Sequence, residues 1–273
     1  MYKRQKLDYG LLDDPRNDVS VRLNSTVINV QNNKSAGGTV TVSYVRDNQL
    51  EKVSASKCIL ACNSNVIPFI CPELPDKQKE ALAFQVKVPI LYTNVAVKSW
   101  EAWKNLGIGA MVCPGSYHIV SMLDFPVTYG NYEFSRNERE PIVIHMERFP
   151  HSYGSNLSAR EQYKLGRYEL LTTPFETIER NVREQLESSL SEGGFNAAKD
   201  ILGITVNRWS HGYSYWYNPL FDPIYDDYND SRYPHIIGRK KYGNITIANA
   251  DSAANAMLES AIEEAYRAVS ELI

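Results

Sequence analysis

The chain has 273 residues, of which 43% are hydrophobic and 22% charged, and its formal net charge is −3. These values are typical of a folded protein with one large or two ordinary domains, and they exclude an intrinsically disordered chain. The weak negative charge provides no basic field for nucleic acid, and no apolar run reaches the roughly 18 residues of a membrane span. The basic residues 1–6 lead into no apolar segment, so these residues also predict no cleaved signal peptide.

The first part of the chain predicts a β-meander. Apolar and polar residues alternate, as they do in strands, in four segments: 19–23, 27–30, 39–45 and 52–55. Turn residues at 32–38 and 47–48 separate the last three segments. The short apolar run 57–62 follows and is typical of a strand that is buried on both faces.

Helical signals begin after this meander. A short helix is expected over 77–84, and the β-like segment 86–97 follows it. Residues 158–161 and 173–176 each place a hydroxyl residue three positions before a glutamate, which is typical of a capped helix start. The second helix continues as an apolar stripe at Phe175, Ile178, Val182, Leu186 and Leu190.

The last third of the chain combines strands with an aromatic loop. Strands are expected at 201–206 and 245–248, and an acidic, aromatic loop at 213–235. A final helix is expected over 254–272. Its apolar face comprises Ala254, Met257, Leu258, Ala261, Ile262, Ala265, Val269 and Leu272.

The sequence lacks the motifs of several enzyme classes. It contains no GxxxxGK[ST], HExxH or GxSxG, and the glycines within 107–112 lack the third glycine of a dinucleotide fingerprint and predict a loop. The five histidines have no ligand spacing, so no metal is expected. The cysteines fit neither a disulfide scaffold nor a zinc site and are expected to be buried free thiols: Cys58, Cys62, Cys71 and Cys113.

Two features could carry chemistry. The segment 243–251 runs from a strand through small residues into a helix start, whose partial positive charge suits an anion or an electron-rich ring. The alternative is that Asp251 or Ser252 only caps the helix. The second feature is a tyrosine-rich segment over 213–233, which holds six of the 18 tyrosines together with several aspartates and suits an organic cation. The alternative is a surface loop that packs on itself.

Six strings resemble, in order, the C-terminal portion of the flavin-containing amine oxidoreductases, specifically the spermidine dehydrogenase-like branch. They are VRLNSTV (21–27), CPELPDKQKEAL (71–82), QVKVPILYTNV (85–95), LDFPVTYGNYEF (123–134), ITVNRWSHGYSYWYNPL (204–220) and NITIANADSAANAM (244–257). Family members begin with a strand, a GxGxxG loop and a helix that bind the ADP half of FAD, and no string here corresponds to that segment. The resemblance therefore implies a C-terminal fragment that binds FAD poorly by itself.

The implied fold is a mixed α/β, two-domain FAD-dependent amine oxidase fold with an incomplete Rossmann-like FAD domain. Residues 1–75 would form a β-meander and strand of the FAD domain, and 76–208 a substrate domain with a mixed sheet and flanking helices. Residues 209–273 would form the aromatic loop and then return to the FAD domain as a strand and a helix.

The resemblance also implies cofactor-binding roles. The backbone of Val27 would meet the adenine, and Asp251, with Ala250 beside it, stands where a family acid, more often glutamate, bonds the ribityl chain. Met257 and Leu258 fall where the start of a helix faces the flavin pyrimidine edge. Two positions carry other residues where glycine is usual in the family: Asn249 and Ser260.

Catalytic roles are implied for four residues. Lys87 aligns with a lysine that holds a water at flavin N5, although a snorkelling surface lysine is the alternative. Trp209, together with Tyr213 or Tyr215, would supply aromatic walls around the substrate amine, and spacing does not choose between the two tyrosines.

The resemblance implies FAD-dependent oxidation of a small amine, with a polyamine such as spermidine as the leading substrate and no metal. One alternative is a redox-silent remnant that binds cationic amines or a protein partner through the tyrosine-rich segment. Another is a flavin oxidoreductase that acts on a different amine, an amino acid or a carotenoid. No signal in the sequence specifies the electron acceptor, the oligomeric state or the compartment.

Overall fold

The computed structural model describes residues 8–14, 16–33, 38–124, 127–128, 133–152 and 154–273. Part of the string 123–134 therefore lies outside the described residues. The chain divides into two compact units: unit 1 comprises Met1–Val86 and Ser214–Ile273, and unit 2 comprises Lys87–Tyr213. These divisions lie 11 and 5 residues beyond the expected ends at 75 and 208.

The predicted β-meander forms the N-terminal part of unit 1. It is an antiparallel sheet of β1 (Ser25–Asn32), β2 (Val40–Arg46) and β3 (Gln49–Ala55). Asp47 and Asn48 both have positive φ, which is typical of a tight hairpin turn between twisted strands. The expected strand at 19–23 is not formed, because none of the described strands pairs with this segment and its alternating apolar side chains are exposed.

Two distant segments form a parallel strand pair in unit 1. β4 (Cys58–Leu60) pairs with β10 (Ile245–Ile247), and all three residues of β10 are buried. The core around the pair includes Leu60, Ile67, Leu82, Ile245 and Ile247. The remaining helical elements of unit 1 are η1 (Tyr9–Asp13), η2 (Ser64–Val66), α1 (Ile67–Ile70), α2 (Asp76–Phe84), α7 (Pro234–Gly238), η4 (Ala250–Ala253) and α8 (Leu258–Ser270).

Helix α2 belongs to unit 1, although the sequence placed it in the substrate domain. It packs against α7, where the Gln78 side-chain amide donates to the Gly238 carbonyl at 3.0 Å. A Cβ on Gly238 would come within 3.2 Å of the Leu82 side chain, so the glycine permits the close approach of the two helices.

The C-terminal helix differs from the expectation in its start and its orientation. Ala254 has φ +47 and separates η4 from α8, so α8 begins at Leu258 and not at 254. Its buried side carries the charged Glu264, whereas most of the expected apolar face is exposed: Met257, Leu258, Ile262, Ala265 and Val269. Within the described part of the chain, α8 thus presents an uncovered apolar surface.

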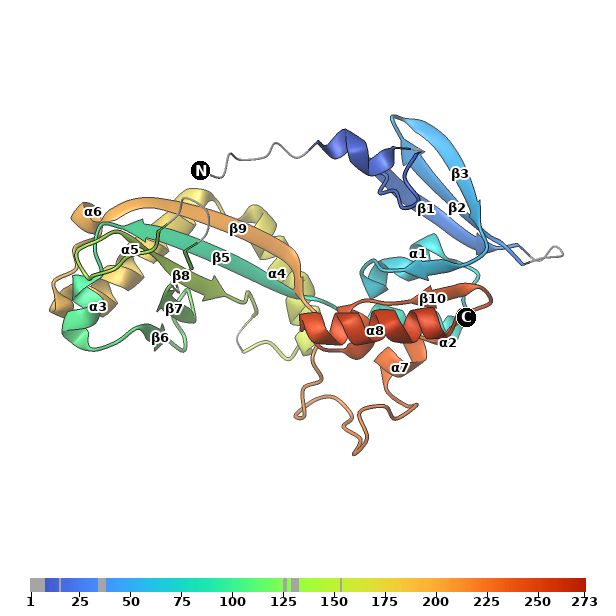
Figure 1. Cartoon of the computed structure of the whole chain (residues 1–273). Helices are drawn as coiled ribbons and strands as arrows, with labels where there is room; N and C mark the ends of the chain where they lie inside the picture. Colours follow the sequence, from blue (N-terminus) through green and yellow to red (C-terminus); the bar gives the residue numbers. More distant parts are fainter. Residues whose placement is uncertain (1–7, 15, 34–37, 125–126, 129–132, 153) are drawn as a thin grey trace. The chain divides into compact units, whose positions relative to one another are not determined.

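Unit 2 is built on a five-stranded sheet in the order β6-β7-β8-β5-β9. The strands are β5 (Val88–Val97), β6 (Ala110–Val112), β7 (Val120–Leu123), β8 (Ile142–Arg148) and β9 (Ile201–Tyr213). Figure 1 shows β5 and β9 running side by side as long strands. The described pairings are all antiparallel, where a mixed sheet was expected, because no helical crossover joins neighbouring strands in the same direction. The expected loop at 107–112 contains β6.

Helices cover one face of this sheet. They are α3 (Glu101–Leu106), α4 (Ala159–Thr172), α5 (Phe175–Leu190), η3 (Ser191–Gly193) and α6 (Ala197–Asp200). The predicted apolar stripe of α5 is buried from Ile178 to Leu190 against sheet residues such as Val95 and Ile144. The predicted capping box of Ser158 is present, but Thr173 ends α4 and Pro174 precedes α5 without a side-chain cap.

Candidate functional site

The C-terminal ends of β4 and β10 form one polar edge in unit 1. Because the two strands are parallel, the loops that follow them leave the sheet at the same end, where ligands of open α/β sheets bind. The Ser64 backbone N–H donates to Asp251 Oδ2 at 3.0 Å, and the Asn249 side-chain amide donates to the Cys62 carbonyl. These bonds join the two loops, and we call residues 61–65 and 248–255 the β4–β10 edge.

Asp251 lies inside this edge and is only 1% exposed. The capping alternative assigned Asp251 or Ser252 to the start of the helix, but Asn249 caps η4 by accepting from the Ser252 backbone at 2.8 Å. The Asp251 carboxylate instead holds the opposite loop. All four cysteines are free, as expected, but of the four only Cys71 is buried: Cys58 and Cys113 are partly exposed, and Cys62 is exposed in the loop beyond β4.

Two buried polar atoms of the β4–β10 edge lack a partner. Asn65 Oδ1 and Asn255 Oδ1 accept no hydrogen bond from the described residues. A buried carbonyl without a donor costs about 1–3 kcal/mol. The edge therefore fits a polar ligand that supplies donors, such as the hydroxyl and ring N–H groups of a flavin nucleotide.

The tyrosine-rich segment largely packs on itself. The Tyr217 ring lies 4.8 Å from that of Tyr233 and 5.6 Å from that of His235. The Tyr217 hydroxyl forms a hydrogen bond with His235 Nδ1 at 3.0 Å and accepts from the His235 backbone N–H at 3.2 Å. The Tyr215 hydroxyl donates to Asp222, and Tyr215 is 2% exposed. These rings build structure and offer little free surface to a cation.

The buried His235 should make the stability of the chain pH-dependent. Burial, together with the charge of Arg239, lowers its pKa to about 4, against about 6.5 in an unfolded chain. The unfolded state therefore binds more protons between these values, and stability falls as the pH drops from about 6.5 to about 4, by up to about 3 kcal/mol. The buried His118, whose pKa burial lowers to about 3, adds a dependence of the same sign, so we expect His235→Gln, which retains a polar partner for Tyr217, to reduce the pH dependence.

Urea unfolding at pH about 7.5 and about 5 measures the effect of His235. The exposed His211, changed to Gln, is the matched control and should keep the wild-type pH dependence. Equal slopes for the two variants would contradict a role for His235.

Three of the residues with implied catalytic roles lie in unit 2. Lys87 directly precedes β5 and is 8% exposed. This low exposure differs from that of a surface lysine, which was the snorkelling alternative. Its carbonyl accepts from the Arg167 guanidinium at 3.0 Å. Trp209 and Tyr213 lie on β9 and are 56% and 40% exposed, and the Tyr213 ring stacks on Phe149 at 6.4 Å. These two aromatic side chains are accessible from solvent.

The other implied site residues lie in unit 1. Tyr215 is buried there, so the two tyrosines that spacing did not separate belong to different units. Val27 is on β1 and half-exposed, and Ala250 begins η4 beside Asp251. Met257 is the N-cap of α8 and Leu258 its first residue, in agreement with the implied helix start.

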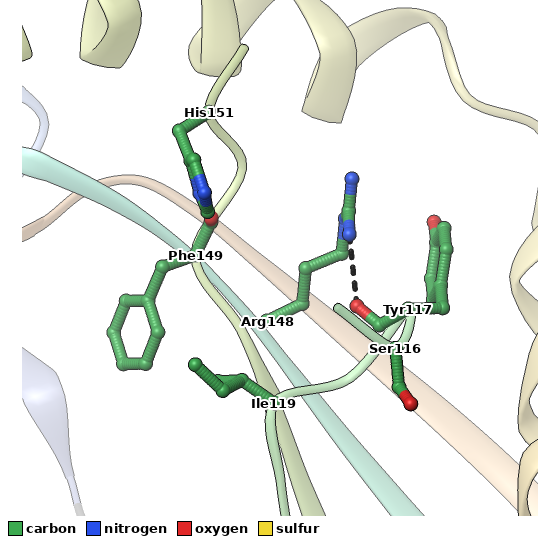
Figure 2. A pocket seen from close by; sticks show the side chains of 6 residues that line it. All are labelled: Ser116, Tyr117, Ile119, Arg148, Phe149 and His151. Atoms are coloured by element: carbon green, nitrogen blue, oxygen red, sulfur yellow. Dashed lines mark hydrogen bonds between the residues drawn. The ribbon is translucent and has the colours of Figure 1, made fainter. Parts of the chain in front are cut away.

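A small pocket in unit 2 is a weaker candidate. Figure 2 shows the Arg148 guanidinium near Tyr117, whose carbonyl accepts from it at 2.8 Å. The guanidinium also lies over the Tyr117 ring and pairs with Glu169 at 2.7 Å. The cavity holds about 20 Å³, which is room for one water, so it does not fit an amine substrate.

Among the described residues, no group of three or more His, Cys, Asp or Glu side chains could hold a metal ion. No helix in this part of the chain has the length and apolar character of a membrane span.

Comparisons with known proteins give matches only among solved structures, since no family model and no curated protein matches the sequence. The match to a putrescine oxidase variant with redesigned cofactor binding covers 91% of this chain and 48% of the oxidase chain, with a TM-score of 0.61 and 15% identity. The fold is that of the FAD-dependent amine oxidases. The match to cyclohexylamine oxidase from Brevibacterium oxydans IH-35A covers 90% of this chain and 47% of that oxidase chain, with a TM-score of 0.60 and 12% identity.

Putrescine oxidase bound to putrescine has the same fold, with a TM-score of 0.54 and 13% identity over 91% of this chain. The expected fold class is thereby confirmed. The chain spans about half the length of these amine oxidase structures.

Proposed function

We propose that this chain is the substrate- and cofactor-facing part of an FAD-dependent oxidoreductase that oxidises a polyamine such as spermidine. The observation that carries the proposal is the amine oxidase fold, which extends over 91% of the chain. The unpaired carbonyls of Asn65 and Asn255 at the β4–β10 edge support a polar cofactor there.

The cofactor would be held by residues of unit 1. Asn65, Asp251 and Asn255 offer polar groups at the β4–β10 edge, and the first turn of α8 offers backbone N–H groups to the anionic side of the ring. Val27 and Ala250 complete the set that the resemblance implies. When bound, FAD accepts a hydride equivalent from the carbon next to the amine.

The substrate would be held by residues of unit 2. Trp209 and Tyr213 offer accessible ring faces, and an apolar wall favours the neutral, reactive form of an amine because it desolvates the charged form. Lys87, buried at the start of β5, positions a water in this proposal. The redox-silent alternative needs an accessible tyrosine-rich segment, of which Tyr215, Tyr217 and Tyr233 are buried and Tyr213 and Tyr228 are exposed.

Flavin reduction tests the proposal. The chain is joined to the N-terminal half of the putrescine oxidase neighbour, loaded with FAD and mixed anaerobically with spermidine, cyclohexylamine or an amino acid. We expect spermidine to bleach the flavin absorbance fastest. Lys87→Met should retain FAD and slow the bleaching by about 10²-fold, because it alters the reacting geometry and not cofactor affinity. A stably bound flavin that no amine reduces would contradict the proposal.

A further inference from the structure

Aromatic rings pack together around α7 in unit 1. The ring centre of Tyr217 lies 4.8 Å from that of Tyr233, 5.6 Å from that of His235 and 6.5 Å from that of Tyr228. The Tyr225 ring continues the series at 4.8 Å from Tyr233. We call these five residues the ring cluster. Tyr217, Tyr233 and His235 are buried, whereas Tyr228 is 43% exposed. Because electron transfer weakens steeply with distance, ring contacts of this kind connect the buried Tyr217 with the protein surface.

His235 places a base beside the Tyr217 hydroxyl, which lies 3.0 Å from its Nδ1. Burial, together with the charge of Arg239, lowers the pKa of His235 to about 4, so its ring is neutral near pH 7. A hydrogen bond with the Tyr228 backbone acts in the opposite direction on this pKa, which is the effect of a carbonyl that accepts from a ring N–H. A ring that donates its Nε2–H to this carbonyl presents the lone pair of Nδ1 to the phenol. The Tyr217 proton therefore has an acceptor at hydrogen-bond distance.

The other buried tyrosines of this segment have different partners. The Tyr233 hydroxyl donates at 3.1 Å to the backbone carbonyl of Tyr225, which is too weak a base to take a proton. The Tyr215 hydroxyl donates to Asp222, whose carboxylate is the competing proton acceptor. Tyr217 is favoured because its ring also contacts those of Tyr228 and Tyr233, through which an electron can leave.

We propose that Tyr217 and His235 form a redox-active pair that gives one electron to a one-electron oxidant of the oxygen-centred radical class. The electron leaves through the ring cluster, and the oxidant is reduced by one electron. The phenol O–H bond of Tyr217 breaks, and its proton forms a new N–H bond at His235 Nδ1. The products are a neutral Tyr217 radical and an imidazolium. Without the base, oxidation would leave a radical cation in a buried site, where an uncompensated charge is costly. The step uses neither flavin nor amine, so it does not rest on the proposed function.

Flash photolysis of the chain without flavin tests the pair. A ruthenium tris-bipyridine complex, photo-oxidised by a cobalt(III) quencher, is the one-electron oxidant, and EPR detects the tyrosyl radical. Radicals at exposed tyrosines decay by coupling to one another, whereas Tyr217 is 3% exposed and its radical should persist. We expect Tyr217→Phe to lose the persistent radical, and the exposed control Tyr168→Phe to retain the wild-type yield. His235→Gln should slow formation of the radical by about 10²-fold, because it removes the positioned base.

The Tyr215→Phe variant separates the pair from its competitor and should retain the persistent radical. The proposal is overturned if Tyr215→Phe loses this radical, if Tyr217→Phe retains it, or if the wild type forms none.

Measurements on the wild type keep the test independent of folding, since they decide the matter if a variant loses its circular dichroism signal. The persistent radical in heavy water should show coupling to one exchangeable deuteron, which is the proton shared with His235. Labelling of histidine with nitrogen-15 should alter the spectrum of the radical through the same hydrogen bond. A persistent radical that histidine labelling leaves unchanged would show that His235 is not its partner.

Discussion

Replacing Glu264 with alanine should lower the free energy of unfolding by about 3 kcal/mol, because it leaves the largely buried Arg239 guanidinium without its paired carboxylate and leaves Arg267 with Glu271 alone. The Glu264 side chain is 8% exposed and bonds Arg239 and, at 2.8 Å, Arg267. Arg239 also donates to the Ser252 carbonyl at 3.2 Å, and Arg267 to the Ile247 carbonyl. The network therefore connects α8 with the end of β10 and with η4.

Urea unfolding measures this effect, with Glu263→Ala as the matched control on the same helix. Glu263 is exposed, so its removal should change the free energy of unfolding by less than about 0.5 kcal/mol. Because the network supports the β4–β10 edge, we also expect Glu264→Ala to weaken cofactor retention. A Glu264→Ala variant as stable as Glu263→Ala would show that the ion pairs contribute nothing to folding.

Removing the ring of Trp209 or of Tyr213 should lower kcat/KM for spermidine by about 10²-fold in the flavin-loaded protein. A single cation–π contact accounts for about 0.5–2 kcal/mol, and the larger loss reflects the position of the reacting carbon. Tyr215→Ala should act differently. Its ring is buried against Phe84 and its hydroxyl holds Asp222, so the main effect should be a loss of stability.

Steady-state kinetics and urea unfolding of the three alanine variants separate these roles. Tyr168, an exposed tyrosine on α4 of the same unit as Tyr213, provides the control when changed to alanine. We expect its kcat/KM and stability to equal those of wild type. If Trp209→Ala and Tyr213→Ala fold normally and retain kcat/KM within a factor of about two, the amine is bound elsewhere.

The sequence by itself determined the features that depend on local periodicity. The meander from β1 to β3 follows from alternation and from the Asp47–Asn48 turn, and α5 follows from its apolar stripe. The class of fold also followed from the sequence, through strings that resemble an amine oxidase in order. These signals act between residues that are close in the chain, and tertiary contacts here reinforce them.

Tertiary structure decided which segments meet. The β4–β10 edge joins residues 187 positions apart, such as Ser64 and Asp251, and no local pattern specifies that pairing. Spacing also did not separate Tyr213 from Tyr215, because residues two positions apart lie on the same face of a strand. In the structure β9 ends at Tyr213, and Tyr215 belongs to unit 1.

Helix α8 shows most clearly what only tertiary structure decides. Its apolar stripe is visible in the sequence, and burial of that stripe is the usual outcome because it removes apolar area from water. In this structure Arg239, from a different segment, pairs with Glu264 on the side of α8 opposite the apolar stripe. The charged side of the helix is therefore buried, and residues of the stripe such as Leu258 and Ile262 remain exposed. Periodicity identifies the faces of a helix, but the partners that the rest of the fold brings to it determine which face is buried.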